Sequence, residues 1–224
     1  MPHTKINNIY GLHICKTGGR FYHSSVLTPV TQSSDIKFPV LQDGSAGHYG
    51  WHRSIGPRTF IVAGIRDIVK QNCSLFVDIG VTESKSNMGF DFSKEAFLKW
   101  ILNSHHAQNN MSKHFFYSEP IANYGMYLDS RPMKDLDKIL ERAARVNLYY
   151  DIDEGFTTAE LSKKLSDALG IEYRPNPNAN TLPVGENPQS KALYESLDDS
   201  EKEFIQNVSF LDYQLYKFIK DTGK

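Results

Sequence analysis

Ile9-Tyr-Gly-Leu-His-Ile-Cys-Lys-Thr-Gly-Gly-Arg20 is the stretch around which the rest of this chain is organised. The apolar run over residues 9–14 predicts a buried strand, residues 16–19 predict a tight turn, and residues 21–27 predict a helix. Together these make a phosphate cradle, because glycines let the backbone approach an anion and N–H groups converge at a helix N-terminus. Lys16 adds a point charge at its mouth, so we expect the chemistry here.

A second strand and helix follow the same plan. The continuous apolar run Thr59-Phe-Ile-Val-Ala-Gly-Ile65 is typical of a parallel strand covered on both faces. Arg66 and Asp67 come next, and the apolar spacing from Ile68 onward predicts a helix that carries Ser74. Ligands of open α/β sheets bind beyond the carboxyl ends of the strands. We therefore expect Arg66 at the edge where the phosphate loop also opens.

These two patterns resemble the nucleotide motifs of sulfotransferases that use 3′-phosphoadenosine 5′-phosphosulfate (PAPS). The segment His13-Ile-Cys-Lys-Thr-Gly-Gly19 is similar to the family loop His-x-Pro-Lys-Thr-Gly/Ala-Gly-Thr/Ser. Arg66-Asp-Ile68, with Ser74 eight residues after the arginine, is similar to the family's 3′-phosphate motif. A Walker A loop instead places its lysine after the glycines. The resemblance implies an α/β fold with a P-loop-like parallel sheet flanked by helices, in a single domain over residues 1–224.

The resemblance also implies roles for individual residues. Lys16 would stabilise the leaving phosphate, and Arg66 and Ser74 would hold the 3′-phosphate of PAPS. The 5′-phosphate would be held by Thr17, Gly18, Gly19 and Arg20. No metal is required for this chemistry.

The carbohydrate-type branch of the family carries a histidine between its two nucleotide motifs, which makes His48 the candidate general base. His52 is its competitor, and both lie in a glycine-rich segment that predicts a loop. A histidine has the right ordinary pKa for proton transfer near neutral pH. The acceptor would then be a small molecule or a glycan that offers a hydroxyl group.

Three positions depart from the family pattern. Cys15 replaces a proline, Arg20 replaces Thr or Ser, and Ile68 replaces the proline after Arg-Asp. The hydroxyl lost at position 20 would lie near the phosphosulfate, which leaves a non-catalytic nucleotide-binding relative as one alternative. The other is a P-loop small-molecule kinase that uses ATP and Mg²⁺, against which stands the lack of an aspartate of the Walker B type.

Composition limits the kinds of partner that this protein is expected to bind. The chain has 224 residues, of which 25 are basic and 26 acidic, so a nucleic-acid-binding surface is not expected. No window approaches the roughly 18 apolar residues of a membrane span. We therefore expect a cytoplasmic protein with no membrane partner and with Cys15 and Cys73 as free thiols. The sequence does not indicate an oligomeric state.

Further along, capping and periodicity predict most of the remaining elements. Ser93 is expected to cap a helix, and Thr157-Thr-Ala-Glu160 forms a capping box for a helix that ends at Gly170. The other predictions are an irregular aromatic segment over 113–128, a helix from Pro132, a strand over 146–150, a loop over 174–189 and one final helix from Ser200.

Overall fold

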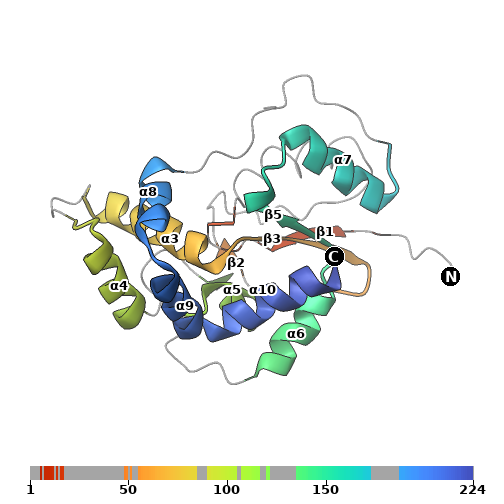
Figure 1. The fold of residues 1–224 in the computed structure, drawn as a ribbon. Helices are drawn as coiled ribbons and strands as arrows, with labels where there is room; N and C mark the ends of the chain where they lie inside the picture. Colours follow the sequence, from red (N-terminus) through yellow and green to blue (C-terminus); the bar gives the residue numbers. More distant parts are fainter. Residues whose placement is uncertain are drawn as a thin grey trace.

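The computed structural model describes residues 6, 8–12, 14, 16–17, 48–49, 51, 55–84, 90–104, 107–116, 120–121, 135–172 and 187–223. Of residues 8, 48–49, 82–84 and 120–121 it describes the backbone alone. Within these ranges the chain forms a parallel sheet, a short antiparallel strand pair and a set of helices (Figure 1). None of the helices in these ranges is long and apolar enough to cross a membrane.

Three parallel strands form the main sheet, in the order β1 (Asn8–Leu12), β3 (Thr59–Ile65) and β5 (Leu148–Asp151). Tyr10 pairs with Ile61 and Val62 pairs with Leu148, so β3 is the central strand. The strands predicted over 9–14, 59–65 and 146–150 are all present, and β3 has the predicted ends. The predicted α/β class is confirmed as a small parallel sheet flanked by helices.

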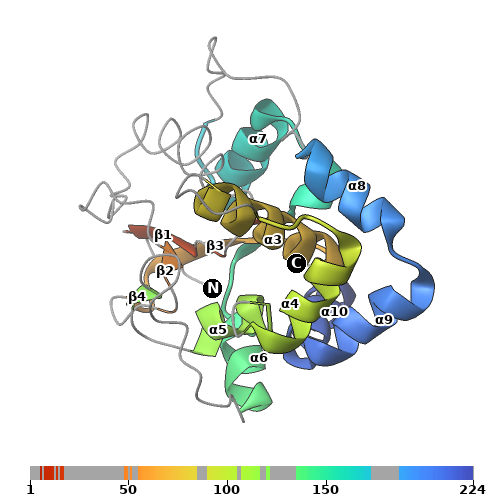
Figure 2. The ribbon, with the colours of Figure 1, turned by 90° about the vertical axis from the view of Figure 1, so that its left-hand side faces the viewer.

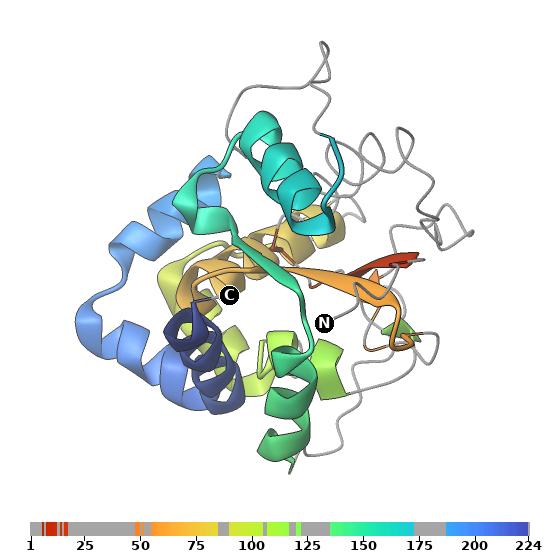
Figure 3. The ribbon, with the colours of Figure 1, turned by 90° about the vertical axis from the view of Figure 1, so that its right-hand side faces the viewer.

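Helices cover both faces of this sheet (Figures 1 and 3). On one face, Ile61 and Ala63 of β3 pack among three helices, whereas Phe60 and Val62 on the other face pack against α7 (Thr158–Leu169). Successive side chains of a strand point to opposite faces, which is why a strand buried on both reads as one continuous apolar run. The three helices of the first face are α5 (Asn110–Phe116), α6 (Leu136–Ala144) and α10 (Phe210–Thr222).

A second group of helices packs together beyond the sheet (Figure 2). Its centre is the buried ring of Phe76, which contacts Phe97 with the ring centroids 5.3 Å apart. The thiol of Cys73 is buried in the same cluster, as predicted, while Cys15 lies outside the described residues. The members are α3 (Ile68–Ser84), α4 (Lys94–Asn103), α8 (Pro188–Ser196) and α9 (Asp199–Val208).

Helix ends that depend on nearby residues are predicted correctly. Ser93 caps α4, and Thr157 and Glu160 form both bonds of the capping box that begins α7. Gly170 ends α7 in the left-handed conformation, with φ of 68°.

Several predicted boundaries are wrong. Residues 113–116 belong to helix α5 rather than to an irregular segment, and α6 begins after its cap Asp135 rather than at Pro132. The predicted loop over 174–189 ends early, because α8 starts at Pro188. The predicted final helix is two helices, since Asp198 caps α9 and Ser209 separates α9 from α10.

Candidate functional site

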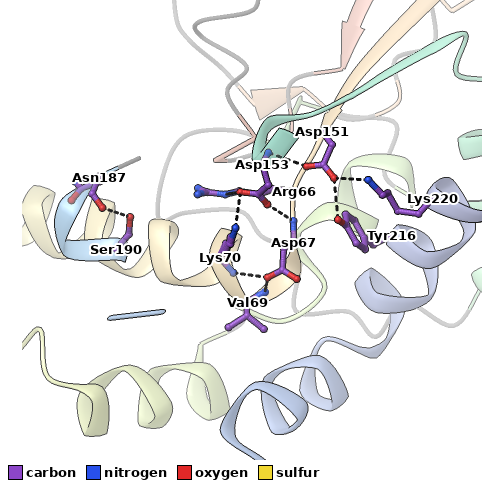
Figure 4. A network of polar contacts seen from close by, with 10 residues as sticks. All are labelled: Arg66, Asp67, Val69, Lys70, Asp151, Asp153, Asn187, Ser190, Tyr216 and Lys220. Atoms are coloured by element: carbon purple, nitrogen blue, oxygen red, sulfur yellow. Dashed lines mark hydrogen bonds and ion pairs between the residues drawn. The ribbon is translucent and has the colours of Figure 1, made fainter. Parts of the chain in front are cut away.

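The carboxyl ends of the three strands meet at one edge of the main sheet. Parallel strands have no other arrangement, so the segments that follow β1, β3 and β5 are brought side by side. Polar side chains lie in all three segments: Lys16 after β1, Arg66 and Asp67 after β3, and Asp151 and Asp153 at and after the end of β5. Figure 4 shows those of the second and third segments. This edge is the candidate site.

The turn after β1 is held tightly against the central strand. Lys16 has a φ of 59°, in the left-handed region that a lysine seldom adopts. Thr17 is fully buried, and its hydroxyl donates a hydrogen bond to the carbonyl of Ile14 over 3.0 Å. A Cβ atom on Gly64 of β3 would lie only 2.6 Å from the carbonyl oxygen of Thr17. The turn can therefore approach this closely only because residue 64 is a glycine.

Lys16 contacts helix α3, which begins at the end of β3. Its Nζ lies 3.1 Å from Oδ1 of Asp78, and both side chains are partly exposed. Asp78 is one helical turn after the buried residue Ser74, so the two lie on the same side of α3. Lys16 therefore contacts α3 on the side of the helix that also carries Ser74, the other predicted residue.

Arg66 leaves the end of β3 and is only 6% exposed. Its Nε lies 3.2 Å from Oδ1 of Asp153. Next to it, Asp67 caps α3, because its Oδ1 accepts hydrogen bonds of 3.0 Å from the backbone N–H groups of Val69 and Lys70. The strand end and the helix start thus hold both Arg66 and Asp67 in place.

Sequence reasoning missed the acidic residues around β5. Asp151 ends this strand, and its Oδ2 accepts hydrogen bonds from the Tyr216 hydroxyl (3.0 Å) and from Nζ of Lys220 (3.1 Å) (Figure 4). Lys220 also lies 3.0 Å from Oε1 of Glu154. An aspartate that ends a buried strand was the signal that could have identified Asp151. Nothing nearby in the sequence indicates Lys220, which comes, like Tyr216, from the C-terminal helix α10.

Burial and neighbouring charges shift the pKa values at this edge. Burial raises the pKa of the Asp67 carboxyl, and the nearby charge of Asp153 raises it further, whereas the N–H groups at the start of α3 oppose both effects. Burial also raises the pKa of the Tyr216 hydroxyl, together with the charge of Asp151. The hydrogen bond to Glu154 is the main cause of the raised pKa of Lys220. At neutral pH Tyr216 is therefore a neutral donor and Lys220 a cation.

The structure brings three of the predicted site residues to one edge and places a fourth on a helix that begins there. Lys16, Thr17 and Arg66 lie at the strand ends, and Ser74 lies on the helix that starts there. The other predicted residues of the PAPS site, Gly18, Gly19 and Arg20, lie outside the described residues. The helix predicted over 21–27 lies outside them as well.

The backbone of His48 is described and corrects one prediction. His48 belongs to the short strand β2 (His48–Tyr49) rather than to a loop, and β2 pairs antiparallel with β4 (Pro120–Ile121). The side chain of His48 and the whole of His52 lie outside the described residues. The role of either histidine as a base stays a prediction.

In the part of the chain that the structure describes, no group of three or more His, Cys, Asp or Glu side chains could hold a metal ion. No protein-family model, no curated protein and no solved structure matches the chain significantly. The functional argument therefore depends on the geometry of the strand ends and on the resemblance of the two motifs.

Proposed function

We propose that this protein transfers the sulfuryl group of PAPS to a hydroxyl acceptor, and that its fold is the P-loop-like fold of PAPS-dependent sulfotransferases. One observation carries the proposal: Lys16 follows β1 and Arg66 follows β3, and these strands are neighbours in a parallel sheet. Two motifs about fifty residues apart in sequence therefore open at the same edge, as ligand sites in open α/β sheets do.

The contacts around the turn are consistent with a cradle for an anion. Thr17 is packed against Gly64, and Lys16 has a strained backbone that the surrounding structure maintains. In the proposed reaction the acceptor oxygen forms a bond to sulfur while the bond from sulfur to the phosphate oxygen breaks. Lys16 would neutralise charge on the departing adenosine 3′,5′-bisphosphate. Thr17, Gly18, Gly19 and Arg20 would bind its 5′-phosphate, and Arg66 and Ser74 its 3′-phosphate.

The proton of the acceptor hydroxyl would pass to a general base, for which we propose His48. A positioned base of this kind contributes roughly 10² to 10⁴ to the rate. The acceptor is a small molecule or a glycan that offers a hydroxyl group. If only the His52→Ala variant loses rate while its nucleotide affinity is unchanged, the base is His52.

The kinase alternative would need an aspartate at a strand end to bind Mg²⁺. Asp151 ends the buried strand β5 and has that location, which corrects the expectation that the chain lacks such an aspartate. Its carboxylate, however, is already engaged by Lys220 and Tyr216 of α10. This arrangement favours sulfuryl transfer over phosphoryl transfer from ATP. A non-catalytic relative would bind the nucleotide in the same way and differ only in turnover.

Thermal unfolding in the presence of nucleotides tests the proposal. Adenosine 3′,5′-bisphosphate at 100 times its Kd should add about 2.7 kcal/mol to the free energy of unfolding. For a chain of this size each kcal/mol raises Tm by roughly 2–4 °C. Arg66→Ala should abolish the shift, whereas Arg58→Ala, in an exposed turn before β3, should retain it. Stabilisation by ATP and Mg²⁺ alone would favour the kinase, and no response to either ligand would contradict the proposal.

Lys16→Ala should remove transfer while leaving the fold intact. The pair with Asp78 is partly exposed and contributes at most about 1 kcal/mol to stability. We expect the rate of sulfuryl transfer to fall on the order of 10²-fold or more, measured with a panel of hydroxyl acceptors. Lys163→Ala, which removes an exposed lysine of α7 from its pair with Asp167, is the matched control. Equal activity of the two variants would disprove the role of Lys16, and wild-type binding without any turnover would favour the non-catalytic relative.

A further inference from the structure

One carboxylate at the strand-end edge contacts three different groups around the start of α3. Oδ1 of Asp153 lies 3.2 Å from Nε of Arg66 and 3.6 Å from Nζ of Lys70. Its Oδ2 accepts a hydrogen bond of 3.0 Å from the backbone N–H of Asp67 (Figure 4). Neither nucleotide motif of the sequence includes Asp153.

Asp153 comes from a short helical turn that is hydrogen-bonded to the end of β5. It lies in the 3₁₀ helix η2 (Ile152–Glu154), directly after β5, and its own N–H donates to Oδ1 of Asp151 over 3.0 Å. Asp151 is held in turn by Tyr216 and Lys220 of α10. The backbone of Asp153 is therefore anchored to Asp151, which belongs to β5 and is held by the C-terminal helix.

The contact with Arg66 involves Nε, the nitrogen nearest the main chain. A guanidinium group is planar, so an anion held at Nε determines the plane in which the terminal nitrogens lie. Arginine loses much rotamer freedom when it is held in one orientation. If that orientation exists before the ligand arrives, the entropy is not lost on binding.

We propose that Asp153 is a positioning residue, which orients Arg66 so that its guanidinium group binds the 3′-phosphate of the nucleotide. This inference rests on the proposed function. It names the residue that makes the proposed nucleotide site prefer a nucleotide with a 3′-phosphate. The alternative role for the same contact is competition, in which the carboxylate occupies the place of the phosphate. The two roles predict opposite effects, because removal of a competitor strengthens binding.

The test compares two nucleotides that differ only in the 3′-phosphate. Asp153→Asn keeps the size of the side chain and one acceptor oxygen for the Asp67 N–H, but it removes the charge. We expect the Kd for adenosine 3′,5′-bisphosphate to rise on the order of 10-fold, as for the loss of a charge-assisted hydrogen bond, with the Kd for adenosine 5′-monophosphate unchanged. Asp167→Asn, the same change in an exposed pair on α7, should alter neither Kd.

Two further variants separate positioning from a general structural effect. In the Arg66→Ala background, Asp153→Asn should cause little further loss, because it acts through the arginine. If Asp153→Asn does not fold, Tyr216→Phe loosens Asp151 without touching Arg66 and should weaken bisphosphate binding selectively, to a smaller extent.

Equal weakening for both nucleotides, no change, or tighter bisphosphate binding in Asp153→Asn would overturn the positioning role. The proposed function would survive those results if Arg66→Ala still lost bisphosphate binding. If the wild-type protein bound the two nucleotides equally, both the inference and the proposed function would be wrong.

Discussion

At the scale of single residues, Gly64 decides how close the phosphate loop lies to the sheet. A Cβ at this position would approach both the carbonyl oxygen of Thr17 and the ring of Tyr150 to 2.6 Å. Real Cβ atoms essentially never come so close, and the Thr17 oxygen is part of the backbone, so the whole turn would have to move. The position of Lys16 therefore depends on a missing side chain in another strand.

Gly64→Ala should thus destabilise the fold by about 1–3 kcal/mol, the usual cost of overpacking. Because the turn moves, it should also weaken binding of adenosine 3′,5′-bisphosphate. Urea unfolding and calorimetric titration measure the two effects. Gly56→Ala is the matched control, since nothing lies within 4 Å of a Cβ there and its φ is not left-handed. Similar results for the two variants would show that the close approach at Gly64 is unimportant.

At the scale of elements, α5 and α10 cap one another. The buried carboxylate of Asp212 in α10 accepts hydrogen bonds from the backbone N–H groups of Met111 (3.0 Å) and Ser112 (2.6 Å) at the start of α5. In return, Oδ1 of Asn109 accepts from the N–H of Leu211 at the start of α10 over 2.9 Å. Residues in or next to each helix therefore accept hydrogen bonds from the N–H groups at the start of the other. The short helix α5 depends on a residue about one hundred positions away in the sequence.

This arrangement makes stability depend on pH. Burial raises the pKa of the Asp212 carboxyl, while the bonds from Ser112 and Met111 and the charge of Lys113 oppose the rise. A carboxyl with a raised pKa binds its proton more tightly in the folded state, so its favourable contribution is full below the ordinary Asp pKa of about 3.9. That contribution is lost as the pH rises through the raised pKa.

We therefore expect the free energy of unfolding of the wild-type protein, minus that of Asp212→Asn, to fall as the pH rises above about 4. Urea unfolding of both proteins at several pH values between 4 and 7 measures this difference. Asp167→Asn, in an exposed pair on α7, gives the background for an unburied carboxyl. A difference that grew with pH would show that the N–H bonds to the carboxylate outweigh the cost of its burial.

At the scale of the whole molecule, the candidate site is built from the entire length of the chain. Lys16 lies in the turn after the first strand, Arg66 directly after the central strand and Asp153 in the turn after the last strand of the sheet. Tyr216 and Lys220 reach the same edge from the last helix, which lies across one face of the sheet (Figure 1). The C-terminal helix thus takes part in holding the site as well as in the core.

Predictions succeeded where local sequence was sufficient. The ends of β3 followed from one apolar run, and those of α7 from a capping box at its start and a glycine directly after its last residue. They failed where distant residues decide the structure. Helix α5 looked irregular because its capping group, Asp212, is remote, and the separation of α9 from α10 at Ser209 interrupts an apolar stripe that continues through both.

The sequence by itself determined the α/β class, the three parallel strands and the two motifs that bear Lys16 and Arg66. Apolar periodicity and glycine turns carry this information, because burial on one or two faces and permitted backbone angles are local constraints. Only the tertiary structure decided that Lys16 pairs with Asp78 and that Arg66 pairs with Asp153. Ion pairs between distant segments produce no periodic pattern in a sequence. They form because parallel strands end at a common edge, which brings the segments that follow them together.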